Sequence, residues 1–189
     1  MPRLLWSPSN ERVKKTNLYN YFLFLEEKTK IQFSFDYSKI WSWSISHPAE
    51  FWLSLIDYLG IQYKGSSNPV IEKDKFIYNQ EFFKNIKVNY AENILYNLNS
   101  CPITFINELG FKKSYYKEDL VSKTSILANY FRSIGVKKGD RITAVAVNSA
   151  ETLIAFLAVN SIGAIWSSCS PDFGEAAILD RFNQIKPKI

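Results

Sequence analysis

The sequence has few of the residues that build metal or redox sites, with two cysteines and one histidine among 189 residues. Cys101 and Cys169 are far apart and give neither a disulfide framework nor metal-ligand spacing, and His47 alone cannot complete a cluster. We therefore expect no metal-binding residue. The sparse use of cysteine fits the reducing cytoplasm, where we expect the protein to reside.

Long apolar runs are also missing. No window approaches the uninterrupted apolar stretch of a membrane span, and residues 1–15 lack an apolar run of signal-peptide length. With 47% hydrophobic residues the chain can still build a core. We expect a globular protein without a membrane partner.

Glycine patterns that bind phosphate are absent or incomplete. No two of the seven glycines have G-x-G spacing, which argues against a dinucleotide-binding dehydrogenase. Gly60 and Gly65 have the spacing of a phosphate-binding loop, but no lysine follows Gly65 and no strand is predicted before Gly60. We interpret residues 60–66 as an ordinary loop.

The charged and reactive residues form no obvious site. The net charge of +5 comes from scattered lysine pairs, which indicate a solvated surface rather than a nucleic-acid interface. The five tryptophans and fourteen phenylalanines are typical of a core. Cys169 would need a neighbouring base to act as a nucleophile, but His47 is predicted at a distant helix start. We therefore predict no catalytic and no cofactor-binding residue in this chain.

The last third of the sequence follows an α/β pattern. A charge-free apolar run predicts a strand at Ile142–Val147 that is buried on both faces. Asn148 and Glu151 have the spacing of a helix cap, and the apolar helix after them is expected to end at Gly163 in a left-handed conformation. A second buried strand is predicted at Ala164–Ser168, which completes a βαβ unit.

A further helix follows the second strand. Asp172 and Glu175 repeat the cap spacing, the helix presents one apolar stripe, and Pro187 ends it. Lys188 and Ile189 would then begin a third strand, so we expect the sequence to stop inside a repeating α/β pattern. The predicted stripe consists of Ile178, Phe182 and Ile185.

The front of the chain is aromatic and mostly helical. We predict a helix capped by Thr16 or Asn17, a helix from Pro48 to Gly60, a surface loop at 62–74 and a short helix capped by Asn89. A hairpin at 103–106 and 113–116 leads to a helix that ends at Gly135. The short helix is expected to run through Ile94, Leu95 and Leu98. The apolar faces expected on the other helices consist of Leu18, Tyr21, Phe22, Leu25, Phe51, Trp52, Leu55, Ile56, Leu59, Leu120, Thr124, Leu127, Phe131 and Ile134.

Five stretches resemble a known family. They are Leu5–Ser9, Trp43–Trp52, Val88–Leu95, Gly135–Arg141 and Gly163–Gly174. The chain is similar to the amino-terminal part of acetoacetyl-CoA synthetases, within the acyl-adenylate-forming (AMP-binding) superfamily. The run Trp-Ser-Ser-Cys-Ser-Pro-Asp-Phe-Gly at 166–174 resembles the acetoacetate branch most specifically.

The resemblance implies a fold and a reaction. It implies an α/β protein that contains the first βαβα units of an adenylation domain. A composition shift near residues 99–102 places the boundary between a helical, aromatic-rich front region, residues 1–99, and the hairpin with those units, residues 100–189. In the complete family enzyme a carboxylate such as acetoacetate attacks ATP to give an acyl-adenylate, and coenzyme A then displaces AMP with help from Mg²⁺. The family's phosphate loop and its nucleotide and CoA contacts are expected after Ile189, so we expect no cofactor bound by this chain.

Two functional hypotheses follow. The chain is either a piece of an acetoacetate-activating or other short-chain acyl-CoA ligase, inactive alone and completed by a downstream polypeptide, or a stand-alone binding module derived from that family. A downstream reading frame with the phosphate loop would favour the first.

Overall fold

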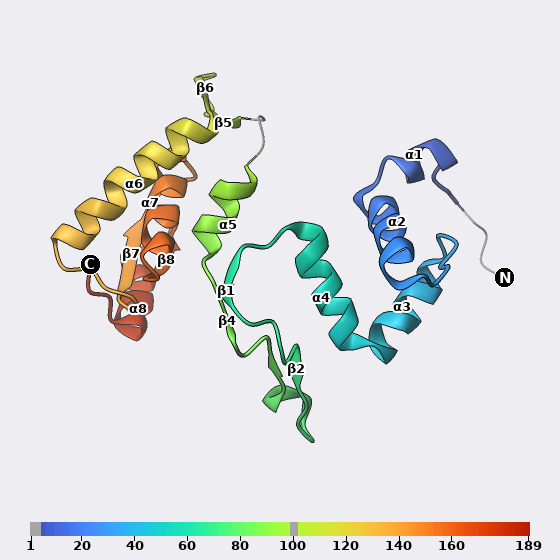
Figure 1. Cartoon of the computed structure of the whole chain (residues 1–189). Coiled ribbons are helices and arrows are strands. Elements are labelled where there is room, and N and C mark those ends of the chain that lie inside the picture. Colours follow the sequence, from blue (N-terminus) through green and yellow to red (C-terminus); the bar gives the residue numbers. More distant parts are fainter. Residues whose placement is uncertain (1–4, 99–101) are drawn as a thin grey trace. The chain divides into compact units, whose positions relative to one another are not determined.

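The computed structural model describes residues 5–98 and 102–189, which fall into two compact units, Met1–Lys87 and Val88–Ile189 (Figure 1). The expected domain boundary at residues 99 and 100 lies outside the described residues, as does Cys101. The chain is a mixed α/β protein with small sheets, which confirms the predicted fold class.

The first unit consists of helices followed by short strands. Its elements are α1 (Asn10–Lys14), α2 (Asn17–Thr29), α3 (Tyr37–Ser46), α4 (Pro48–Leu59), β1 (Tyr63–Gly65), β2 (Ile71–Glu72), η1 (Ile77–Asn79), β3 (Glu81–Phe82) and β4 (Ile86–Val88). Strand β1 pairs with β4, and β2 pairs antiparallel with β3. The stretch 62–74, predicted as a loop, therefore contains two short strands.

Local signals explain where the helices of the first unit start and stop. The Thr16 hydroxyl accepts a hydrogen bond from the Tyr19 amide, 3.1 Å away, and so caps α2 as predicted. Pro48 occupies the first turn of α4, where its missing N–H costs nothing, and Gly60 ends the helix with φ of +61°.

The core of the first unit is aromatic. It is built from Tyr21, Phe22, Leu25, Phe33, Ile40 and Trp43. The Tyr21 hydroxyl lies 2.8 Å from the buried Ser54 hydroxyl, and burial raises the pKa of Tyr21. The prediction was wrong for Leu18, Trp52 and Leu59, whose side chains are 46%, 42% and 55% exposed.

The second unit contains one short helix, a hairpin and an α/β arrangement. Its elements are α5 (Tyr90–Asn97), β5 (Ile103–Ile106), β6 (Lys112–Tyr115), α6 (Lys117–Ser133), β7 (Arg141–Val145), α7 (Ala150–Ser161), β8 (Ile165–Cys169) and α8 (Glu175–Ile185). Strands β5 and β6 form the predicted antiparallel hairpin, with Ile103 opposite Tyr115. The side chain of Asn89 accepts from the Glu92 amide and caps α5 as predicted.

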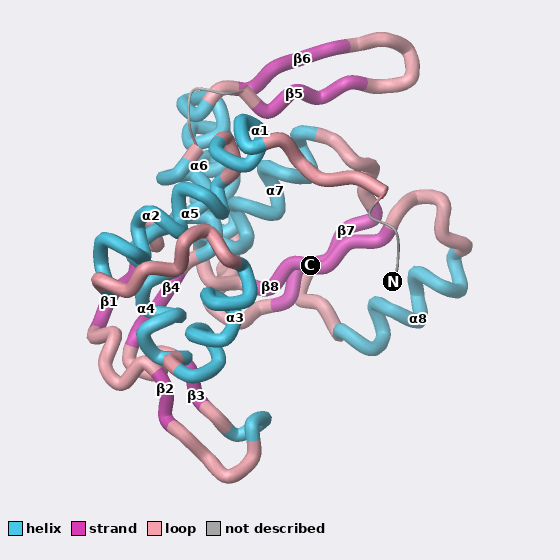
Figure 2. Tube along the Cα trace, turned by 90° about the vertical axis from the view of Figure 1, so that its right-hand side faces the viewer, coloured by secondary structure: helices cyan, strands magenta, loops and turns pink. Residues whose placement is uncertain are grey.

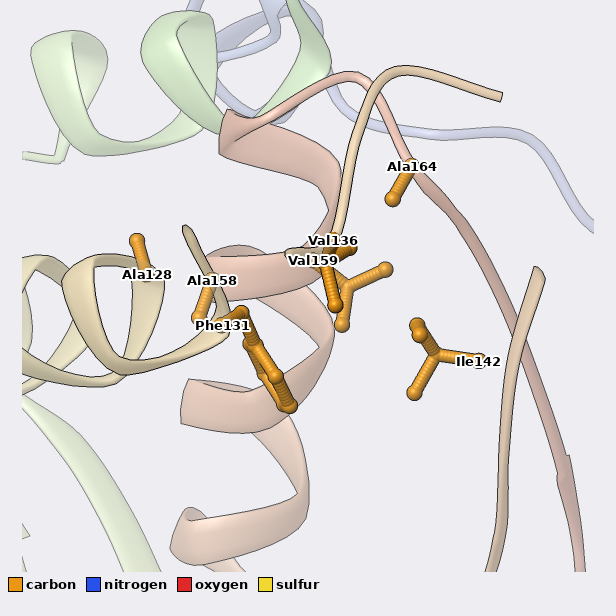
Figure 3. Close-up of a cluster of buried hydrophobic side chains, with 7 residues drawn as sticks. All are labelled: Ala128, Phe131, Val136, Ile142, Ala158, Val159 and Ala164. Atoms are coloured by element: carbon orange, nitrogen blue, oxygen red, sulfur yellow. The ribbon is translucent and has the colours of Figure 1, made fainter. Parts of the chain in front are cut away.

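Strands β7 and β8 are parallel, and their register pairs Arg141 with Ile165 and Val145 with Cys169. Helices α7 and α8 lie on opposite sides of this pair of strands (Figure 2). A buried cluster fills the space between α6, α7 and the sheet (Figure 3). It consists of Ala128, Phe131, Val136, Ile142, Ala158, Val159 and Ala164.

The last two residues extend the sheet. The Lys188 amide donates to the Arg141 carbonyl at 2.8 Å, and the Thr143 amide donates to Ile189, also at 2.8 Å. Both bonds use the edge of β7 that faces away from β8. The spatial order is therefore β8, β7 and then residues 188–189, in agreement with the predicted start of a third strand.

Several sequence predictions in this unit need correction. The cap of α7 is Ser149 instead of Asn148, because Ser149 has the extended backbone and accepts from the Thr152 amide. Asp172 does not cap α8; Gly174 precedes that helix, and the Asp172 carboxylate accepts from the Ser170 hydroxyl.

Burial was also overestimated. Strand β7 ends at Val145, so Val147 lies beyond it, and both valines are exposed. Ile165 of β8 is 52% exposed, which contradicts burial on both faces. Ile134, at the end of the predicted apolar stripe on α6, is 45% exposed. By contrast, Gly163 has the predicted left-handed conformation, with φ of +77°.

Candidate functional site

The candidate site is the edge of the parallel sheet where β7 and β8 end. In open α/β sheets, ligands bind outside the carboxyl ends of the strands, at the point where the strand order reverses. Here the chain goes from β7 to β8 on one side and returns to residues 188–189 on the other side of β7. The reversal therefore falls at the end of β7.

The loop after β7, residues 146–149, is held by short-range hydrogen bonds. The Thr152 hydroxyl donates to the Val147 carbonyl at 2.8 Å, and the Thr152 amide donates to the Ser149 hydroxyl at 3.3 Å. The Ala146 amide donates to the Cys169 carbonyl at 3.0 Å and ties the ends of the two strands together. The loop is therefore fixed to both β8 and α7.

Glu151 stands in the first turn of α7 beside this loop. A hydrogen bond from its own backbone amide lowers the pKa of the Glu151 carboxyl, and the Ser149 and Tyr115 hydroxyls add to the effect. The Tyr115 hydroxyl donates to Glu151 Oε1 at 3.3 Å. Glu151 is therefore held as a carboxylate, and this carboxylate connects the hairpin to α7.

A cavity of about 360 Å³ lies between strand β5 and the start of α7. Its lining is mostly apolar, with the amide of Asn148 and the hydroxyls of Thr104 and Ser149 as polar groups. The residues that line it are Ile103, Thr104, Phe105, Ile106, Asn148, Ser149, Ala150 and Leu153.

The loop after β8, residues 170–174, is a compact turn. The Ser170 hydroxyl donates to the Asp172 carboxylate at 2.9 Å, and the Phe173 amide donates to the Ser170 carbonyl at 3.2 Å. The Arg181 guanidinium lies 4.7 Å from the centre of the Phe173 ring. This edge of the sheet thus presents hydroxyls, carboxylates and one nearby arginine.

Within the described part of the chain, neither a preformed metal cluster nor a phosphate loop is found. Among the residues that the structure describes, no three His, Cys, Asp or Glu side chains gather closely enough to hold a metal ion. Residues 60–66 follow helix α4 instead of a strand, so they lack the strand-to-helix geometry of a phosphate loop. We therefore assign no step involving ATP, Mg²⁺ or coenzyme A to the described residues.

The reactive residues weighed from the sequence are not brought together. His47 is exposed at the junction of α3 and α4, where its Nδ1 lies 2.9 Å from the Ser46 hydroxyl and its ring stacks on Trp43. Its interpretation as a helix-start residue is confirmed. Cys169 is buried at the end of β8 in the other unit, as expected of a structural residue.

A polar cluster at the opposite, amino end of β7 was missed in the sequence. Lys188 Nζ lies 2.6 Å from Asp140 Oδ2 and 2.6 Å from the Gly135 carbonyl, and the Arg141 side chain donates to the Lys186 carbonyl. Gly135, Asp140 and Arg141 belong to the Gly-Val-x-x-Gly-Asp-Arg stretch, which was recognised as a motif without a role. In the structure this stretch holds the third strand against β7.

The Asp140 carboxylate gives a pH-dependent prediction. The hydrogen bond from Lys188 and that from the Lys137 amide lower its pKa below the ordinary value. A lowered pKa stabilises the fold above the unfolded-state pKa, about 3.9, and this contribution disappears as the pH falls through the folded-state pKa. We expect Asp140→Asn to lower the urea midpoint at pH 7, by an amount that shrinks below about pH 4.

Asp180→Asn, on the exposed face of α8, is the matched control for this titration, and its urea midpoint should follow that of the unmodified chain. Lys188→Met should reproduce the loss seen for Asp140→Asn, and the double variant should be little worse than either single one. Full additivity of the two single losses would show that the ion pair does not couple these residues.

The comparisons with known proteins agree with this arrangement. Residues 105–189, which carry the parallel sheet, match the family described as AMP-binding enzyme. The fold therefore matches part of the fold of adenylate-forming enzymes, as the sequence motifs predicted.

Within that class, the chain is similar to acetoacetyl-CoA synthetases. It is 33% identical to acetoacetyl-coenzyme A synthetase of Rhizobium meliloti, over 99% of this chain and 29% of that protein. It is 37% identical to the Mus musculus acetoacetyl-CoA synthetase, over 82% of this chain and 24% of that protein. The solved acetoacetyl-CoA synthetase of Streptomyces lividans superposes with a TM-score of 0.91 at 25% identity, over 98% of this chain and 29% of the other. The chain thus spans less than a third of the length of these relatives.

One further observation concerns membranes. Among the described residues, no helix combines the length and the apolar character that crossing a bilayer requires.

Proposed function

We propose that this chain is the amino-terminal part of an acetoacetate–CoA ligase and supplies the start of its adenylation domain. The observation that carries the proposal is the superposition of 98% of the chain on a solved acetoacetyl-CoA synthetase with a TM-score of 0.91. A stand-alone binding module is the weaker alternative, because the similarity runs through the whole chain instead of one surface.

In the complete ligase, the substrates are acetoacetate, ATP and coenzyme A, with Mg²⁺ as cofactor, and the enzyme works in the cytoplasm. AMP is a better leaving group than the oxide that a free carboxylate would have to expel. Forming the acyl-adenylate therefore makes the acyl carbon reactive toward a thiol. Residues 1–99 form the front region and residues 100–189 begin the adenylation domain. The chain's own part is structural: β7, β8 and residues 188–189 form the start of the sheet on which the rest of the domain is built.

The proposal predicts a sharp activity difference. Purified 1–189 should catalyse no acetoacetate-dependent exchange of pyrophosphate into ATP, because its described residues provide no cradle for the triphosphate. Exchange should appear when the chain is co-expressed with the S. lividans synthetase from which the matching 29% has been removed. The intact S. lividans enzyme is the positive control.

Two results would contradict the proposal. Exchange by 1–189 alone would show that it carries its own catalytic groups. A stable complex with the shortened synthetase that remains inactive, while the intact control is active, would show that the chain does not serve as the ligase's front part.

A further inference from the structure

Within residues 5–98 and 102–189, no strand pairs with the outer edge of β8. The Ile165 amide donates to the Asp140 carbonyl at 2.8 Å, and the Cys169 carbonyl accepts from the Ala146 amide at 3.0 Å. Backbone groups alternate in direction along a parallel strand, so the amides and carbonyls of residues 165, 167 and 169 point toward β7. The amides and carbonyls of Trp166 and Ser168 therefore point away from β7, and among the described strands β8 pairs with β7 alone.

Strand β7 has hydrogen-bonded backbone on both of its edges, whereas β8 is paired along the edge that faces β7. Strand β7 bonds to β8 on one side and to residues 188–189 on the other. The edge of β8 is five residues long, and the Ile165 side chain beside it is 52% exposed. A strand edge with outward backbone groups and an exposed apolar side chain beside it is a template for another strand, and native proteins normally cover such edges.

We propose that the outer edge of β8 is the surface on which the remaining part of the ligase docks, by adding a β-strand next to Trp166 and Ser168. This inference rests on the proposed function. The chain accounts for 29% of the superposed S. lividans synthetase, so most of that fold lies outside residues 1–189. An added strand would satisfy the outward backbone groups and cover Ile165 through cross-strand packing.

The test uses proline to remove one outward N–H at a time. Ser168→Pro deletes an amide that points away from β7, so the β7–β8 ladder stays intact and the fold should be kept. Ser167→Pro deletes an amide that points toward β7 and serves as the contrasting variant, since it should lower the urea midpoint. The binding partner in the assay is the co-expressed, tagged S. lividans synthetase that lacks its matching 29%.

A second variant tests the edge of β8 by adding a charge instead of removing an amide. Ile165→Lys places a charge beside the edge, whereas Ile126→Lys makes the same change on α6, where Ile126 is 68% exposed. We expect Ser168→Pro and Ile165→Lys to weaken binding of the shortened synthetase by about tenfold or more, with urea midpoints close to that of the unmodified chain. Ile126→Lys should bind as the unmodified chain does.

The outcomes separate this inference from the proposed function. Binding that is unaffected by both edge variants, or no binding by the unmodified chain, would overturn the docking surface. Edge-dependent binding without pyrophosphate exchange would support the docking surface and contradict the ligase function. Dimers of 1–189 that Ile165→Lys dissociates would assign the edge to a second copy and overturn the proposal.

Discussion

Leu157→Ala should lower the free energy of unfolding of the second unit by about 2–5 kcal/mol, as expected for a fully buried leucine. Leu157 is 1% exposed and lies in α7, the helix that contacts α5, α6 and β8. Removing its side chain takes apolar contacts away and leaves a cavity that these elements cannot close without moving. The loss is measured as a lower urea midpoint at an unchanged slope.

Leu179→Ala is the control for this substitution. Leu179 lies on α8 and is 52% exposed, so the same truncation should change the stability by less than about 0.5 kcal/mol. Equal urea midpoints for Leu157→Ala and Leu179→Ala would show that α7 is not the packing centre of the unit.

The sequence predicted the helices well because their signals are local. Thr16 and Asn89 cap α2 and α5 through hydrogen bonds that span three residues, and Gly60 and Gly163 have the left-handed conformations that their positions after a helix required. Such features depend on neighbouring residues alone. They could therefore be read without knowledge of the tertiary structure.

Caps in the α/β part were less predictable because two residues competed for the same role. Asn148 and Glu151 have the right spacing, but Ser149 is the residue with the extended backbone, at φ of −133° and ψ of 166°. The Asp172 carboxylate was already engaged by the Ser170 hydroxyl. Spacing identifies a cap motif, whereas the turn before the helix decides which residue uses it.

Burial failed where it depends on distant elements. Ile142 and Val145 belong to the same apolar run, yet Ile142 is 3% exposed and Val145 is 46% exposed. Ile142 packs with residues of α6 and α7, while Val145 is on the opposite face of the strand by alternation and stays largely exposed, although α8 contacts β7. A run of apolar residues predicts a strand that can be buried on two faces, but the number of covering elements decides how many faces are buried.

The polar cluster around Lys188 shows the limit of motif reading. The Gly135–Arg141 stretch was visible in the sequence, but its partners, Lys186 and Lys188, are about fifty residues away. Contacts of such separation arise only when the third strand returns to β7. The same reason explains why the candidate site at the ends of β7 and β8 could not be assembled from residue spacing.

Gly65 illustrates a residue whose importance the sequence concealed. It was considered as part of an incomplete phosphate loop, and its actual role is steric. Gly65 has φ of +101° at the end of β1, and a Cβ atom there would overlap the Asn85 carbonyl oxygen next to β4. The pairing of β1 with β4 therefore requires a residue without a side chain.

Gly65→Ala should accordingly open the β1–β4 pair. The clash involves backbone on both sides, so neither strand can relieve it by a rotamer change, and we expect a cost of about 3 kcal/mol in local stability. Limited trypsin digestion at Lys64, Lys84 and Lys87 measures this opening, and cleavage should accelerate roughly a hundredfold when opening is fast relative to cutting. The aromatic core of α2 and α3 is remote from the clash, so its cooperative unfolding should persist.

Gly110→Ala separates the clash from backbone strain. Gly110 also has a positive φ, +78°, but no atom lies within 4 Å of the position that its Cβ would take. The strain alone should cost about 1 kcal/mol there, and cleavage at Lys112 and Lys113 should rise only a few-fold. If the two alanine variants increased cleavage of their own segments equally, positive φ would be the sole requirement at Gly65, and the close approach of Asn85 would have no energetic consequence.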